Sequence, residues 1–229
     1  MQAKPADSLE HAWRSVTQRA EAAAGGRPVR VLAVSKTQPA TAIRTLAGFG
    51  QRAFGENYVQ EALAKQSELA DCALEWHMIG PLQSNKCRDV AEHFDWLQTL
   101  DRTKLVGLLA RHRPSGMAPL NVLVQVNIDD EASKSGCRPD EVAALAEAIA
   151  EHPQLCLRGL MAIPAPDPDM NRRRAAFARM RECFDALRAG HAGIDTLSMG
   201  MSEDFELAIA EGATMVRVGS TIFGPRRRE

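Results

Sequence analysis

The apolar residues near the start of the chain recur at helical spacing. They follow one helix face from Leu9 to Ala20, and Gly25 with Pro28 ends the repeat. This pattern predicts a leading helix over residues 8–24. The next apolar run, residues 29–34, is short and rich in β-branched side chains, which is typical of a buried strand.

A strand followed by a helix is the unit that repeats along the chain. The predicted strands occupy residues 29–34, 52–55, 75–80, 94–100, 121–128, 155–163, 196–199 and 215–223. The helices between them occupy residues 39–49, 57–69, 84–93, 102–113, 139–151, 170–188 and 203–210. Short apolar strands that alternate with amphipathic helices are expected to pair in parallel.

The number of strands favours a closed barrel over an open, doubly wound sheet. No Gly-x-Gly-x-x-Gly motif follows the first strand, so the dinucleotide-binding form of the open sheet lacks its main support. A chain of 229 residues with 45% hydrophobic content can bury a complete core without disulfides or metals. We therefore predict an α/β fold with one domain over residues 1–229, in which a single (β/α)8 barrel of the TIM type spans residues 29–224.

Charge and cysteine content narrow the classes of partner. The 28 Lys and Arg residues nearly balance the 29 Asp and Glu residues, which leaves no overall field to attract nucleic acid or a membrane surface. The basic clusters at 172–174 and 226–228 lack interleaved aromatic residues and are interpreted as solvated surface. The 5 cysteines form no metal-binding or disulfide pattern, and no signal peptide or membrane-length apolar run is present. We expect a cytoplasmic monomer that binds neither nucleic acid nor membranes.

Lys36 closes the first predicted strand, at the barrel end where active sites of such folds lie. A lysine near apolar walls and other cations loses its proton more readily, and a neutral amine can attack an aldehyde to form an imine. The alternative for Lys36 alone is an ordinary lysine that extends from a strand end into solvent.

A candidate phosphate site follows the seventh strand and lies within the eighth. Ser198 and Gly200 come from the first segment, and Gly219, Ser220 and Thr221 come from the second. Barrels commonly hold phosphate here with backbone N–H groups and the start of a short helix. Glycines allow close approach and hydroxyls add donors, although the same residues could simply form turns.

Arg217 stands in an otherwise apolar strand, so its guanidinium must find a partner or reach the barrel mouth. A lysine on one side, a phosphate site on the other and an arginine between them match the outline of pyridoxal phosphate. If Arg217 faces the pyridine nitrogen, it donates a hydrogen bond and keeps that nitrogen unprotonated.

Seven segments together resemble the pyridoxal phosphate homeostasis protein family. They span residues 33–37, 54–61, 76–86, 133–136, 159–164, 198–202 and 216–224. The resemblance implies a barrel similar to the N-terminal domain of alanine racemase, with pyridoxal 5′-phosphate linked to Lys36 and its ring nitrogen facing Arg217.

The resemblance also implies roles for the remaining site residues. It implies that Ser198, Gly200, Gly219 and Ser220 bind phosphate, that Asn57, Met161 and Met199 lie near the ring, and that His77 lies at the rim. Two departures from the family's pattern, Met78 in place of Phe and Ser220 in place of Thr, remove no needed group.

The loop after the fifth strand carries both acidic residues and a lysine. Asp129, Asp130 and Glu131 have no accompanying histidine or calcium-loop pattern, so we expect no metal site. Lys134 is interpreted as a surface amine, or as a second, transient acceptor of the aldehyde on the same barrel face as Lys36.

Three functions use Lys36. The first, implied by the family, is a protein that carries or buffers pyridoxal phosphate and supplies apo-enzymes. The second is a racemase or decarboxylase with the same cofactor, and the third is a Schiff-base aldolase acting on sugar phosphates. We expect little turnover, because racemisation needs two acid/base groups on opposite faces of the substrate. The only tyrosine, Tyr58, is expected to point elsewhere, and the chain ends soon after the eighth strand.

Overall fold

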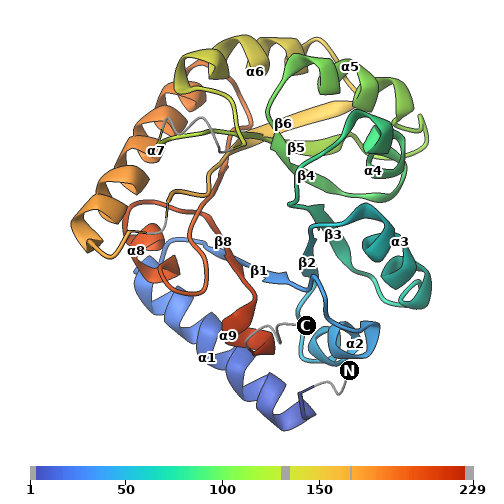
Figure 1. Cartoon of the computed structure of the whole chain (residues 1–229), viewed down its shortest axis with the longest axis vertical. Coiled ribbons are helices and arrows are strands. Elements are labelled where there is room, and N and C mark those ends of the chain that lie inside the picture. Colours follow the sequence, from blue (N-terminus) through green and yellow to red (C-terminus); the bar gives the residue numbers. More distant parts are fainter. Residues whose placement is uncertain (1–3, 130–134, 166, 225–229) are drawn as a thin grey trace.

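The eight strands form a closed parallel barrel in chain order, and β8 pairs with β1 (Figure 1). The computed structural model describes residues 4–129, 135–165 and 167–224. The strands are β1 (Arg30–Val34), β2 (Ala53–Glu56), β3 (Glu75–Met78), β4 (Trp96–Leu100), β5 (Leu120–Gln125), β6 (Leu155–Met161), β7 (Thr196–Ser198) and β8 (Met215–Val218). The prediction of a TIM-type barrel is confirmed.

Helices surround the barrel on its outer side (Figure 1). They are α1 (Ala6–Ala24), α2 (Ala40–Gly48), α3 (Val59–Glu68), α4 (Cys87–His93), α5 (Thr103–His112), α6 (Val142–Ala150), α7 (Met170–Gly190), α8 (Phe205–Ala210) and α9 (Ser220–Phe223), with 3-10 turns η1 (Ser84–Lys86) and η2 (Pro139–Glu141). The leading helix α1 packs against α8, α9 and α2, so it covers the place where the first and last strands meet.

The predicted strand over residues 215–223 is wrong beyond Val218. The chain turns at Gly219. The Gly219 carbonyl accepts hydrogen bonds from the amides of Ile222 at 3.0 Å and Phe223 at 2.9 Å, and the short helix α9 begins there. A short apolar run does not distinguish a strand from a buried helix turn by its composition. The predicted strand 121–128 is also too long. β5 ends at Gln125, and the buried apolar residues after it belong to a loop, which their composition does not reveal.

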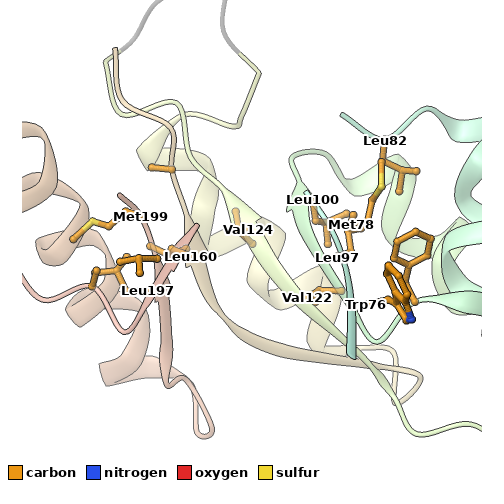
Figure 2. Close-up of a cluster of buried hydrophobic side chains, with 14 of the residues drawn as sticks. Trp76, Met78, Leu82, Leu97, Leu100, Val122, Val124, Leu160, Leu197 and Met199 are labelled. Carbon is orange, nitrogen blue, oxygen red and sulfur yellow. The ribbon is translucent and has the colours of Figure 1, made fainter. Parts of the chain in front are cut away.

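The side chains of the barrel strands alternate between two cores. Along β5, Val122 and Val124 point outward into the main core beneath the helices, where Leu97 and Leu160 also lie (Figure 2). Leu123 points inward and packs with Trp96 and Met161 in the barrel interior. Because the interior is filled, a ligand has access only to the ends of the barrel.

Candidate functional site

A cavity of about 460 Å³ opens at the carboxyl ends of the strands. Five of the predicted site residues line it, namely Lys36, Asn57, Arg217, Gly219 and Ser220. They come from the ends of β1, β2 and β8, of which β8 is far from the other two in the sequence and next to β1 in the barrel. The cavity therefore brings together the amine, the guanidinium and the last segment that the sequence singled out.

The strand end that carries Lys36 is fixed by a buried charged network. The Ser35 hydroxyl donates to Glu56 Oε1 at 2.6 Å, and the Lys65 ammonium donates to the Ser35 carbonyl at 2.8 Å and to Glu56 Oε1 at 2.7 Å. Glu56 and Lys65 are buried, at 0% and 5% exposure. This network holds the backbone immediately before Lys36.

The residue after Lys36 adopts a strained conformation. Thr37 has a φ of 64°, in the left-handed region that a β-branched residue rarely enters. Such strain costs roughly 1–3 kcal/mol and persists only where neighbours impose it. Here the Thr37 amide donates to Glu61 Oε1 at 2.5 Å, and Glu61 is in turn paired with Lys65 at 2.7 Å. Lys36 is thus held from both sides by one network.

Asn57 lines the cavity, and its side-chain oxygen is available to accept a hydrogen bond. Its Oδ1 atom is buried and has no hydrogen-bond partner among the residues that the structure describes. Its backbone is pressed against Gly80, where an added Cβ atom would lie 2.1 Å from the Asn57 carbonyl oxygen. Only glycine allows this contact, which fixes the loop after β2 against the end of β3.

Arg217 places a buried cation at the floor of the cavity. Its side chain is 4% exposed, and its guanidinium donates to Ser198 Oγ and to the Ala162 carbonyl, both at 2.8 Å. Burial lowers the pKa of Arg217 to about 10, which leaves it charged at neutral pH. A guanidinium has five N–H donors in a rigid plane, so these two contacts also set the direction in which it faces.

The start of α9 gathers donors around Ser202, a cavity residue that the sequence interpretation missed. Ser202 Oγ accepts from the amide of Gly219 at 3.3 Å and from the amide of Thr221 at 3.5 Å. Together with the Ser220 hydroxyl, these groups form a cluster of donors suited to an anion. Thr221 itself does not line the cavity, because its hydroxyl turns toward the Ser202 carbonyl at 3.5 Å.

The two residues predicted to bind phosphate from the β7 side are not brought to the cavity. Ser198 is fully buried, and its hydroxyl donates to Gln98 Oε1 at 2.7 Å while it accepts from Arg217. Gly200 has a φ of 89°, and an added Cβ atom would lie 2.5 Å from the Cβ atom of Ala208. Gly200 therefore permits close packing of α8, and Ser198 supports Arg217.

Three further predicted residues lie deeper in the molecule. Met199 is fully buried in the main core and Met161 in the barrel interior. His77 is not a rim residue: it is fully buried, and Ile79, two residues further along the chain, is the one that lines the cavity. The prediction misjudged how far the chain still runs after His77 before it reaches the barrel mouth.

The basic cluster at 172–174 is only partly solvated surface. Arg172 and Arg174 have side chains 75% and 60% exposed, as predicted. Arg173 is 15% exposed and lines the cavity, where it donates to the Asp167 carbonyl and lies 3.9 Å from Asp204. Its interpretation as surface was wrong, since the start of α7 turns this one side chain inward.

Several predictions concern residues outside the described ranges, among them Asp130, Glu131, Lys134 and the cluster 226–228. Asp129, which is described, accepts a hydrogen bond from the Ala165 amide at 2.6 Å. Within the described ranges, no His, Cys, Asp and Glu side chains are grouped as metal ligands. No helix in the same ranges has the length and apolar character needed to cross a bilayer.

The fold and the cavity define a (β/α)8 barrel with a site at the carboxyl ends of its strands, and comparison with known proteins identifies its family. Residues 6–227 match the family described as "Alanine racemase, N-terminal domain". The chain is 56% identical over 211 residues to the pyridoxal phosphate homeostasis protein of Pseudomonas aeruginosa, covering 91% of this chain and 90% of the relative.

Two further proteins agree with this result. The pyridoxal phosphate homeostasis protein of Escherichia coli is 51% identical over 228 residues, covering 96% of this chain and 97% of the relative. The structure of PipY from Synechococcus elongatus with pyridoxal phosphate bound superposes with a TM-score of 0.83 at 37% identity, covering 94% of this chain and all (100%) of PipY. The chain belongs to the pyridoxal phosphate homeostasis protein family, within the alanine racemase N-terminal domain class.

Proposed function

We propose that this protein binds pyridoxal phosphate as a Schiff base on Lys36 and carries or buffers the cofactor without acting as an enzyme. The observation that carries the proposal is one cavity lined by Lys36, Asn57, Arg217 and the donors at the start of α9. The relatives named as homeostasis proteins and the cofactor-bound PipY structure support the same cofactor.

Each polar group of the cofactor has a fitting counterpart in the cavity. Lys36 would supply the amine that forms a C=N bond with the aldehyde carbon of the cofactor, with the aldehyde oxygen leaving as water. Gly219, Ser220 and Ser202 supply donors for the phosphate, and Arg217 supplies a donor for the ring nitrogen. The buried Asn57 Oδ1 atom can accept a hydrogen bond from a ligand hydroxyl.

The cavity offers little support for racemisation. Lys36 can serve one face of a substrate, and a tyrosine would be the natural group for the other. Tyr58 is 62% exposed and does not line the cavity, as the sequence predicted. A cofactor whose ring nitrogen stays unprotonated against Arg217 is also a poorer electron sink, which weakens the case for a decarboxylase.

A chiral assay over a panel of L-amino acids tests the carrier proposal against the enzyme. We expect the cofactor-loaded protein to produce no D-amino acid above the level of free pyridoxal phosphate, because no tyrosine among the described residues lines the cavity. Lys36→Ala is the control. Robust, Lys36-dependent racemisation of any amino acid in the panel would favour the enzyme.

Removing the phosphate from the ligand tests the donor cluster at the start of α9. Hydrogen bonds to charged groups contribute roughly 1.5–3 kcal/mol each, so we expect unphosphorylated pyridoxal to bind at least about tenfold more weakly than pyridoxal phosphate. Absorbance titration gives both dissociation constants. Equal affinities would show that this cluster does not hold the phosphate.

We further propose that the protein works as a monomer in the cytoplasm and that apo-enzymes receive the cofactor from it. All of its cysteines, Cys72, Cys87, Cys137, Cys156 and Cys183, are free, which supports a reducing compartment.

A further inference from the structure

A continuous chain of buried hydrogen bonds leads away from Arg217 through the barrel interior. The Arg217 guanidinium donates to Ser198 Oγ at 2.8 Å, and the Ser198 hydroxyl donates to Gln98 Oε1 at 2.7 Å. The Gln98 side-chain amide is next to His77 Nδ1, at 2.9 Å. Ser198, Gln98 and His77 are all fully buried at 0% exposure. Three strands, β8, β7 and β4, are thereby linked to a fourth, β3.

This series of hydrogen bonds ends on a carboxylate at the other end of the barrel. His77 Nε2 contacts Glu75, the first residue of β3, and Glu75 is paired with Arg30, the first residue of β1, at 2.8 Å. Burial lowers the pKa of His77, which favours the neutral ring. A neutral ring bound to a carboxylate through Nε2 carries its proton on that atom and leaves Nδ1 as an acceptor.

The orientation of each member follows from its neighbours. The His77 ring stacks on Trp96 with centroids 5.1 Å apart and planes 10° from parallel, so it cannot turn freely. With Nδ1 as an acceptor, Gln98 must present its NH2 group to His77 and its oxygen to Ser198. Ser198 must then donate to Gln98, which leaves its oxygen free to accept from Arg217. Every donor therefore points from Arg217 toward Glu75.

We propose that Gln98 and His77 are positioning residues that aim Arg217 at the ring nitrogen of the bound cofactor through Ser198. Glu75, held by Arg30, anchors the far end of these hydrogen bonds. Hydrogen bonds that point in one direction through a medium of low dielectric strengthen one another, so losing a middle member weakens the contact at the end. The role of Arg217 toward the cofactor rests on the proposed function, whereas the hydrogen-bond relay from Arg217 to His77 is formed only by residues of the protein.

The variant Gln98→Met tests the relay, with Gln51→Met as its matched control. Gln51 is also a buried glutamine, and it bonds to Trp13, Val31 and Ala53, which do not line the cavity. We expect both variants to lower the urea midpoint. Only Gln98→Met should weaken pyridoxal phosphate binding, by about tenfold, and shift the absorbance maximum of the bound cofactor, whereas Gln51→Met should stay within about twofold of wild type.

A second measurement needs no cofactor. Nitrogen NMR of the unloaded protein is expected to show His77 neutral with its proton on Nε2. In Gln98→Glu, which keeps the side-chain volume, the new carboxylate faces Nδ1 and His77 should carry protons on both nitrogens. This variant also serves if Gln98→Met does not fold.

The possible outcomes separate the relay from the proposed function. If wild type binds pyridoxal phosphate and the two methionine variants bind it equally well with unchanged spectra, the relay is overturned. A wild-type His77 with its proton on Nδ1 would overturn it as well. If wild type itself fails to bind pyridoxal phosphate, the proposed function fails, while the NMR result still decides whether the relay exists.

Discussion

Lys36→Ala is expected to abolish covalent capture of pyridoxal phosphate by this protein. In wild type, the network of Ser35, Glu56 and Lys65 holds the strand end that carries Lys36, and the strained Thr37 fixes the chain on its other side. The amine therefore meets an aldehyde in one orientation, and borohydride reduction should fix one pyridoxyl group on the peptide that contains it. The variant should lose that label and the visible absorbance of the bound cofactor.

The matched control for this experiment is Lys104→Ala. Lys104 is an exposed lysine on α5, away from the cavity lining, and its loss should leave the label unchanged. A label found only on Lys134 or another lysine, with Lys36 unmodified, would show that the amine is assigned wrongly. Wild-type protein without visible absorbance after addition of the cofactor would favour the aldolase, in which Lys36 binds substrate directly.

The barrel could be predicted because its physical cause is local. Each strand is a short apolar run and each helix has one apolar face, so the order of elements follows from periodicity alone. Lys36 and Arg217 stood out for a related reason: a charged side chain in or directly after an apolar strand must either find a partner or reach the barrel mouth. Both line the cavity.

The positions of the other site residues depend on the path of the chain near the barrel mouth, which periodicity does not describe. The end of β7 and the segment after it offer Ser198 and Ser202, and only the turn at Gly200 decides that Ser198 lies inside while Ser202 meets α9. Whether His77 lies in the interior or at the rim is equally ambiguous in the sequence. A shift of the strand by two residues along the barrel axis would move a side chain from the interior to the rim. Arg173 was missed because a run of arginines usually faces solvent.

The buried pair of Glu56 and Lys65 also escaped prediction. The sequence contained one signal: Lys65 stands four residues after Glu61, which is the arrangement of an ordinary ion pair on a helix surface, and the structure shows that contact at 2.7 Å. What the spacing could not show is that α3 turns Lys65 toward β2, where it meets the fully buried Glu56.

Lys65→Met is expected to destabilise the protein by about 3–5 kcal/mol at neutral pH, because it leaves the Glu56 carboxylate buried without its cation. Burial raises the pKa of Glu56 above its ordinary value of 4.5, while Lys65 and Ser35 oppose that rise. Without Lys65 the pKa rises further. A carboxyl group whose folded-state pKa is raised contributes its stability below the unfolded value, and that contribution is lost as the pH rises through the folded value.

The pH dependence therefore has a definite sign. The difference in unfolding free energy between wild type and Lys65→Met should be smallest near pH 4, where Glu56 is protonated in both proteins, and should grow toward pH 7. Urea unfolding at several pH values measures it, and Lys104→Met, at an exposed site, should stay within about 0.5 kcal/mol of wild type throughout. A small loss of stability, or one that does not change with pH, would mean that Glu56 is solvated or paired in another way. Lys65 also holds the Ser35 carbonyl and the Glu61 carboxylate that accepts from the Thr37 amide. The variant should therefore also bind pyridoxal phosphate more weakly under conditions where it remains folded.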